Sequence, residues 1–166
     1  TELRDVIGRY AEDALEQLKD PYTRIQHLAY WEQKLGDVLL ADIRPSLILE
    51  VRAEIRRSRS NSTANRYVAT LSALLGYVTK ELQLIESNPC HLIKKLKEPK
   101  GHTRMLTGEE RVNLVQACKL CTKYAEMLPI VLLAVTTGMR RGEILNLRWA
   151  DINFTTERIF LWSTKN

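Results

Sequence analysis

The chain has 166 residues, of which 45% are hydrophobic and 27% charged, and it carries a formal net charge of +5. These values exclude a disordered or fibrous protein and favour one or two small globular units. The longest apolar run is far shorter than the roughly 20 residues of a membrane-spanning helix, and the N-terminus lacks the pattern of a secretory signal. We therefore expect a cytoplasmic protein with no membrane partner, in which the three cysteines are reduced thiols.

The first part of the chain has the apolar periodicity of helices. Apolar residues recur at spacings of three and four from Leu3 onward, and the Asp20-Pro21 pair would end this first helix. Pro45 suits the first turn of a third helix, and Ser60 or Ser62 can cap a fourth. The first three helices are predicted over residues 3–18, 25–36 and 45–55, and the fourth continues to residue 82. Their short connections predict a compact bundle of about 85 residues.

A change of composition marks the end of this bundle at Asn88-Pro89. Residues 94–104 are basic, contain proline and glycine, and have few large apolar groups, which is typical of an exposed linker. The net charge is −4 over residues 1–50, +7 over residues 51–104 and +2 over residues 105–166. We predict a helical domain at 1–88, a basic linker at 89–104 and a second domain at 105–166, with an anionic partner bound by the basic middle part.

The second domain is predicted to be α+β. Thr107 and Glu110 have the spacing of a capping box, which starts a helix. Residues 129–135 predict a fully buried helix that ends at residues 136–138, and a short helix follows around Ile144. The period then changes, and residues 149–154 and 158–162 predict the two strands of a hairpin.

Residues 137–152 form the most informative block: Thr-Gly-Met-Arg-Arg-Gly-Glu-Ile-Leu-Asn-Leu-Arg-Trp-Ala-Asp-Ile. Gly138 allows a tight turn that places Arg140 at a helix start, where free backbone N–H groups favour a phosphate. The planar guanidinium of Arg140 can bind two phosphate oxygens, and Glu143, three residues further on, can orient it. On spacing alone, a solvated Arg–Glu pair at the start of a surface helix is the more common interpretation.

This block resembles the first catalytic-arginine motif of the tyrosine recombinases of the phage-integrase type, Thr-Gly-hydrophobic-Arg-x-x-Glu-hydrophobic-hydrophobic-x-Leu-x-Trp-x-Asp-hydrophobic. The resemblance covers nearly the whole chain. It includes the helical bundle, the helix start at residues 62–67, the Asn88-Pro89 break, the basic linker, Leu106-Thr107, and Thr164-Lys165-Asn166 after a strand. The resemblance implies a mainly α fold, with a four-helix SAM-like core-binding domain followed by an incomplete α+β catalytic domain made of helices and a β-hairpin.

The resemblance also implies a function. The family binds double-stranded DNA in a C-shaped clamp, assembles as a tetramer on DNA, and cuts and rejoins strands through a 3′-phosphotyrosyl intermediate without a metal or other cofactor. By resemblance, Arg140 is the first arginine of the phosphate clamp, Glu143 supports it, and Lys165 protonates the leaving 5′ oxygen. Positive charge and a proton donor are what phosphoryl transfer requires.

The family's second catalytic box and its nucleophilic tyrosine follow the hairpin lysine, and none of the six tyrosines here has the nucleophile's context. We therefore expect residues 1–166 to be a fragment that cannot cleave DNA alone. The alternatives are a stand-alone helical DNA-binding regulator without strand-transfer activity, and a structural helical protein with a basic face.

DNA contacts are expected at the start of the fourth helix and along the linker, because Asn suits adenine, Arg suits guanine, and Lys and Arg bind phosphates. Around the helix start, the expected contacts are Arg56, Arg59, Thr63, Asn65 and Arg66. In the linker and beyond it, they are Lys94, Lys95, Lys97, Lys100, Arg104 and Arg141. The alternatives are a capped, solvated helix end and a solvated run of charges.

Zinc is the one metal that the sequence raises as a question, through Cys118-x-x-Cys121 and Cys90-His91. Adjacent Cys90 and His91 are not spaced for chelation, and Cys118 falls within a helical pattern. We predict no metal site.

Overall fold

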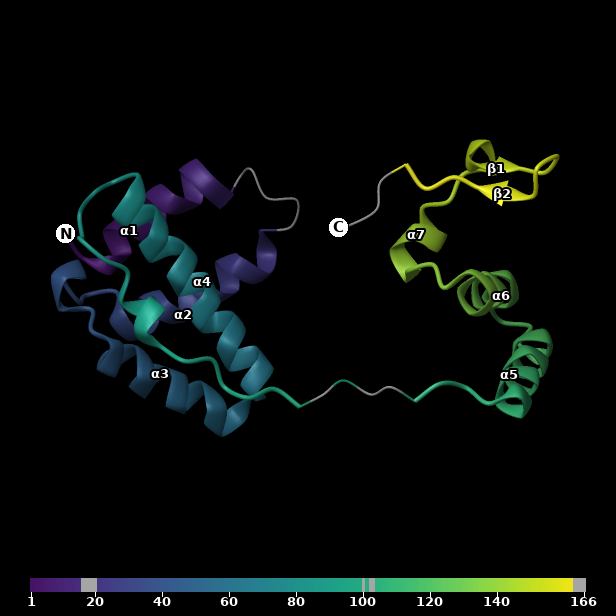
Figure 1. Cartoon of the computed structure of the whole chain (residues 1–166), viewed down its shortest axis with the longest axis horizontal. Coiled ribbons are helices and arrows are strands. Elements are labelled where there is room, and N and C mark those ends of the chain that lie inside the picture. The colour runs from purple at the N-terminus through teal and green to yellow at the C-terminus, as the bar shows by residue number, and fades with distance from the viewer. Residues whose placement is uncertain (16–20, 100, 102–103, 163–166) are drawn as a thin grey trace. The chain divides into compact units, whose positions relative to one another are not determined.

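The computed structural model describes residues 1–15, 21–99, 101 and 104–162. The chain divides into two compact units, Thr1–Gly101 and His102–Asn166 (Figure 1). It is mainly helical, with one small antiparallel pair of strands in the second unit.

The first unit contains the four predicted helices. They are α1 (Leu3–Tyr10), α2 (Tyr22–Leu35), α3 (Pro45–Ser58) and α4 (Asn61–Lys80), and a π-helical turn, Ala11–Leu15, continues α1. Pro45 occupies the first turn of α3. Ser60 caps α4, where its hydroxyl accepts a hydrogen bond from the backbone N–H of Thr63 at 3.2 Å. A Cβ at Gly36 would clash with the Glu32 carbonyl oxygen, so glycine fits the end of α2.

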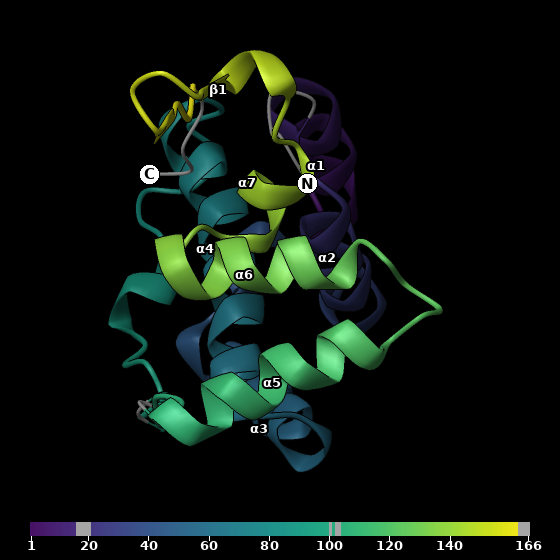
Figure 2. The same cartoon turned by 90° about the vertical axis from the view of Figure 1, so that its right-hand side faces the viewer.

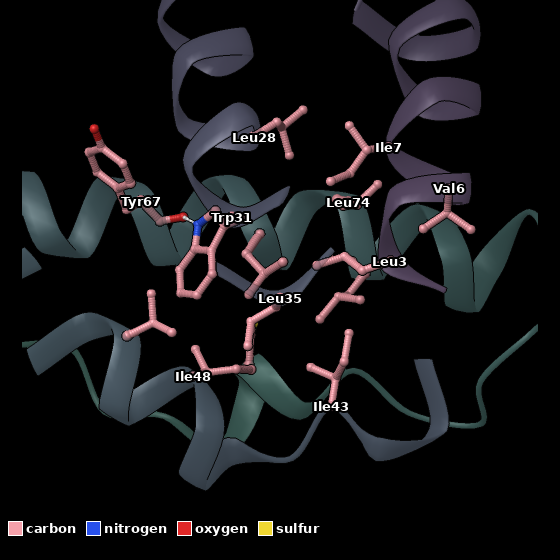
Figure 3. Close-up of a cluster of buried hydrophobic side chains, with 14 of the residues drawn as sticks. Leu3, Val6, Ile7, Leu28, Trp31, Leu35, Ile43, Ile48, Tyr67 and Leu74 are labelled. Carbon is pink, nitrogen blue, oxygen red and sulfur yellow. Dashed lines mark hydrogen bonds between the residues drawn. The ribbon is translucent and has the colours of Figure 1, made fainter. Parts of the chain in front are cut away.

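Helix α4 lies at the centre of the bundle and packs against α1, α2 and α3. Its apolar face is completely buried at Leu71, Leu74, Leu75 and Val78. Trp31 of α2 is also fully buried, and its indole N–H donates to the Tyr67 carbonyl at 2.9 Å (Figure 3). Burying one large apolar side chain contributes about 1.5–3 kcal/mol, so these contacts make up much of the stability of the unit.

The segment after α4 packs back onto the bundle. The Asn88 amide donates to the Ser72 carbonyl at 2.8 Å, and its carbonyl accepts from the Cys90 N–H at 3.0 Å, which starts the 3-10 helix Pro89–Leu92. Cys90 is buried in the core, and this burial raises the pKa of its thiol to about 12. Ile93 and Leu96 also pack against the core. The start of the predicted exposed linker is therefore anchored on the first unit.

The second unit begins with α5 (Gly108–Leu120), and the predicted capping box is present. The Thr107 hydroxyl accepts from the Glu110 N–H at 3.2 Å, and the Glu110 carboxylate accepts from the Thr107 N–H at 2.9 Å. Next comes α6 (Met127–Thr137), which lies beside α5 (Figure 2). The short helix α7 (Arg141–Leu145) then packs against α6.

The predicted hairpin is present but shorter than expected. Strands β1 (Ile152–Asn153) and β2 (Arg158–Ile159) pair antiparallel, with Ile152 opposite Ile159. The predicted first strand was to begin at residue 149, but Trp149–Asp151 forms a 3-10 helix. The reason is a local cap, in which the Arg148 N–H donates to the Asp151 carboxylate at 3.0 Å.

Residues 129–135 were expected to form a fully buried helix; the helix is present, but the prediction that it is buried was wrong. These residues do form most of α6, but none of the helix is buried, and Leu132 and Val135 are each 40% exposed. Among the described residues, α6 packs mainly against α5 and α7, which cover only part of its surface. Apolar composition predicted the helix, but burial depends on how many neighbours surround it.

Replacing Trp31 with Phe should lower the free energy of unfolding of the first unit by about 2–3 kcal/mol, because the indole hydrogen bond is lost and a cavity is left. Urea denaturation followed by circular dichroism measures this change. Trp149→Phe is the matched control, because Trp149 is 81% exposed and its replacement should change stability by less than about 0.5 kcal/mol. Equal effects of the two substitutions would contradict the prediction.

Candidate nucleic-acid interface

The turn before Arg140 is built by glycine. Helix α6 ends at Gly138, which adopts a left-handed conformation with φ of 69° that side chains disfavour. The Thr137 hydroxyl accepts a hydrogen bond from the Met139 N–H at 3.2 Å within this turn. The chain thereby reverses, and Arg140 becomes the N-cap residue of α7. The sequence prediction for this turn is confirmed.

Glu143 holds Arg140 at two points. Its carboxylate accepts from the Arg140 backbone N–H at 2.8 Å and from the guanidinium Nη1 at 2.9 Å. These hydrogen bonds, together with the guanidinium charge, lower the pKa of Glu143 from its ordinary value. The Glu143 side chain is only 14% exposed, whereas that of Arg140 is 62% exposed. The arrangement gives a positively charged planar group with a fixed orientation that is open to solvent.

Two further basic residues, Arg141 and Lys165, were predicted to act with Arg140, and the structure describes only the first of them. Arg141 is exposed at the first position of α7. Lys165 lies outside the described residues, so its predicted role has no geometry here.

The predicted arginines of the bundle lie at the end of α3 and the start of α4. Arg56, Arg59 and Arg66 are exposed, and the Arg59 guanidinium lies over the Tyr67 ring, 5.6 Å from its centroid. The Thr63 hydroxyl lies 3.0 Å from that of Ser60, so it takes part in the cap of α4.

Asn65 was predicted to contact DNA directly, and the structure assigns its side chain to a different contact. The residue is buried, at 8% exposed. Its amide nitrogen donates to the Leu96 carbonyl at 2.9 Å and to the Glu98 carboxylate at 2.7 Å, and its oxygen accepts from the Leu96 N–H at 2.9 Å. Because both donors are used and the oxygen is turned to Leu96, the carboxamide is not presented to a base edge.

The basic residues of the predicted linker lie in different environments. Lys94, Lys95 and Lys97 are exposed on the segment that packs against the bundle. Arg104 forms an ion pair with the capping-box carboxylate of Glu110. Lys100 is outside the described residues.

The sequence alone did not predict that Arg52 and Asn61 bind the basic segment at residues 94–97. The Arg52 guanidinium donates to the Lys94 carbonyl at 2.7 Å, and the Asn61 amide donates to the Lys97 carbonyl at 2.8 Å. Asn61 and Asn65 are four residues apart, so they lie on one face of α4. That spacing is the signal that could have suggested a shared partner.

A buried histidine lies beneath the arginines. The Nδ1 atom of His27 is 3.0 Å from the Thr70 hydroxyl, and its ring lies 3.9 Å from the Tyr67 ring between centroids. Burial, and then the charges of Arg59 and Arg66, lower the pKa of His27. The neutral imidazole is therefore the form that the folded bundle favours.

Two family models together match most of the chain. The N-terminal domain of phage integrase matches residues 1–97, and the phage integrase family matches residues 104–166, which include the Arg140 motif. The chain belongs to the phage integrase family of tyrosine recombinases.

Curated relatives agree with this membership. The chain is 31% identical over 133 residues to a shufflon-specific DNA recombinase of Escherichia coli, covering 80% of this chain and 34% of that protein. It is 30% identical over 151 residues to a putative integrase/recombinase of Haemophilus influenzae, covering 86% of this chain and 41% of that protein. This integrase-family chain therefore spans well under half the length of these two relatives.

Solved structures share the fold. A lambda integrase dimer bound to a COC′ core site superposes with a TM-score of 0.77 at 21% identity, covering 93% of this chain and 56% of that one. The Tn1549 transposon integrase in complex with transposon right-end DNA gives a TM-score of 0.77 at 17% identity, covering 93% and 50%. The mainly helical fold with a small hairpin, predicted from the resemblance, is confirmed.

Two further observations concern the part of the integrase chain that the structure describes. None of its helices has the length and apolar character needed to cross a membrane. No three His, Cys, Asp or Glu side chains come together there in a way that could hold a metal ion. Cys118 is buried on α5, and Cys121 follows the end of that helix.

The bundle should become less stable as the pH falls below about 6.5, the ordinary pKa of histidine. Unfolded His27 has that ordinary pKa and folded His27 a lower one, so between the two values the unfolded state binds more protons and stability falls with pH. Above this window the His27 contribution is constant. Urea denaturation at about pH 7.5 and about pH 5.5 measures the difference.

His27→Gln provides the control for this experiment, because it leaves His91 and His102 in place and removes only the buried imidazole. The variant should lose less stability than the wild-type chain between the two pH values. An identical loss in both proteins would rule out His27 as the source.

Proposed function

We propose that residues 1–166 are the DNA-binding part of a site-specific tyrosine recombinase that cuts and rejoins DNA through a 3′-phosphotyrosyl intermediate. The observation that carries the proposal is the Arg140 guanidinium, which Glu143 orients within a motif that the family profile matches. The proposed organisation is a core-binding domain at 1–88, a linker at 89–104 and the first part of the catalytic domain at 105–166. The structure anchors the start of that linker on the bundle.

In the proposed reaction, a tyrosine of the complete protein loses its hydroxyl proton to solvent, its oxygen attacks the phosphorus atom, and the bond from phosphorus to the 5′ oxygen breaks. Arg140 would bind the non-bridging oxygens, where negative charge increases in the transition state. Glu143 would keep the guanidinium in place, and Arg141 would add positive charge beside it. Lys165 would give its proton to the leaving 5′ oxygen. Removal of one such stabilising donor lowers rates by about 100-fold to 1,000-fold in other enzymes.

The bundle would supply affinity. Exposed arginines on α3 and α4 and exposed lysines on the following segment would contact the phosphates of double-stranded DNA. Lambda integrase has been solved as a tetramer bound to a Holliday junction, at 20% identity to this chain. We propose the same assembly for the complete protein on DNA.

Replacing Lys95 and Lys97 with Ala should weaken binding to all duplexes alike and make the dependence of log affinity on log salt shallower by about two. The reason is that each lost phosphate contact releases about one counterion fewer. Fluorescence anisotropy with labelled duplexes of different sequence, measured over a range of salt, gives both quantities.

Arg9→Ala combined with Lys80→Ala is the matched control. It removes the same charge near the other end of α4, where the Arg9 charge acts on Tyr77 and Lys80 is the last helical residue. This control should keep most of the salt dependence. A wild-type chain that does not bind DNA at all would refute the proposed function, and an unchanged slope in the Lys95 and Lys97 variant would remove these lysines from the interface.

Residues 1–166 should form no covalent adduct with a nicked suicide duplex, whereas the complete gene product should form one. None of the six tyrosines has the sequence context of the family's nucleophile, so none of them is expected to attack the phosphorus atom bound at Arg140. Denaturing electrophoresis of labelled DNA detects the adduct. A covalent product from the 166-residue chain would overturn this part of the proposal.

A further inference from the structure

We propose that Asn65 is a positioning residue for DNA binding. In this proposal, its carboxamide fastens residues 94–98 to the start of α4, so that Lys94, Lys95 and Lys97 are held beside the arginines of α3 and α4. The inference rests on the proposed function, because it takes double-stranded DNA as the partner. It gives Asn65 an indirect part in binding, in place of the direct contact that the sequence suggested.

The geometry of Asn65 is that of a fastener. One carboxamide makes three hydrogen bonds of 2.7–2.9 Å, to the Leu96 carbonyl, the Leu96 N–H and the Glu98 carboxylate. Bonds to both the N–H and the carbonyl of one residue fix the rotation of the backbone at that point. Because Asn65 is 8% exposed, the loss of these bonds would leave polar groups poorly solvated.

Other contacts also hold residues 93–97 against the bundle. Arg52 and Asn61 hold the carbonyl oxygens of Lys94 and Lys97, on either side of Leu96. Ile93 and Leu96, three residues apart, pack against the core of the bundle. With its apolar side chains turned inward, the segment leaves its lysines exposed.

Electrostatics explains why a fastener is needed. Residues 51–104 carry a net charge of +7, so a lysine-rich segment is repelled by the arginines of α3 and α4. Neutral hydrogen bonds from Asn65 hold the segment without adding charge. Glu98 opposes the repulsion locally, because its carboxylate accepts hydrogen bonds from Asn65 and Ser62 and interacts with the charges of Arg66 and Lys95, which together lower its pKa.

Fixing the segment before DNA arrives should increase affinity. Lysines on a mobile tether would have to be ordered during binding, which costs conformational entropy of the backbone. On the fastened segment, that ordering has occurred during folding. The lysines are then expected to contact phosphates together with Arg66, as one surface.

The test is Asn65→Ala in the complete 166-residue chain, with binding of a labelled mixed-sequence duplex measured over a range of salt. The variant should bind about tenfold more weakly, with a salt slope shallower by about one to two, because the lysine contacts are no longer held in place. Asn146→Ala is the matched control. It removes a carboxamide that donates to the Gly142 carbonyl of α7, four residues earlier in the chain, and it should leave both quantities unchanged.

A double-mutant cycle separates positioning from general destabilisation. Lys95→Ala with Lys97→Ala should cost much less affinity in the Asn65→Ala background than in the wild-type chain, because the lysines there contribute little. An equal cost in the two backgrounds would overturn the proposal, as would wild-type affinity and slope in Asn65→Ala.

Two further measurements keep the result decisive. Leu96→Pro removes the N–H that donates to Asn65 without changing any residue of α4, so it should reproduce the loss of affinity if Asn65→Ala fails to fold. Hydrogen exchange of the Leu96 amide tests the fastener without DNA and should be faster in Asn65→Ala. Equal exchange would refute the fastener itself, whereas slow wild-type exchange without any DNA binding would refute the proposed function instead.

Discussion

Helix α4 depends on the complete burial of its apolar face, and the first unit depends on α4. Leu71, Leu74, Leu75 and Val78 are inaccessible to solvent, and the indole N–H of Trp31 fixes the rotation of α2 against α4 through the Tyr67 carbonyl. A helix held on three sides has a fixed axial position as well as a fixed rotation. The backbone at its start, which carries Asn61, Asn65 and Arg66, is therefore fixed relative to the rest of the bundle. The basic surface of the bundle is in this sense a product of apolar packing.

The second unit positions its charged group by local means. Gly138 reverses the chain, and Glu143 binds both the backbone and the guanidinium of Arg140. These contacts span only a few residues and need no deep core. This difference fits the contrast in burial, because α6 has exposed apolar side chains, whereas the apolar face of α4 has none. A local clamp can preserve the orientation of Arg140 even where the surrounding packing is sparse.

The features that could be predicted from the sequence are those set by neighbours in the chain. The Ser60 cap, the Thr107 and Glu110 capping box and the left-handed Gly138 each depend on residues at most four positions away. The pairing of Asn65 with Leu96 crosses 31 positions, and a short polar side chain at a helix start is equally compatible with binding a base. The exposure of α6 could not be predicted either, because an apolar run specifies a preference for burial and not the partner that provides it. The 3-10 helix at residues 149–151 replaced part of a strand because one carboxylate, that of Asp151, capped the backbone.

The contact between Arg104 and Glu110 has a consequence for the distribution of charge along the chain. The same carboxylate closes the first turn of α5 and neutralises the last basic residue before it. Arg104 therefore differs from the exposed Lys94, Lys95 and Lys97, because its charge is paired with the carboxylate that caps the next helix. The folding of α5 thus also pairs the charge of Arg104, and a chain in which that first turn frayed would leave this arginine as an additional free positive charge before the helix.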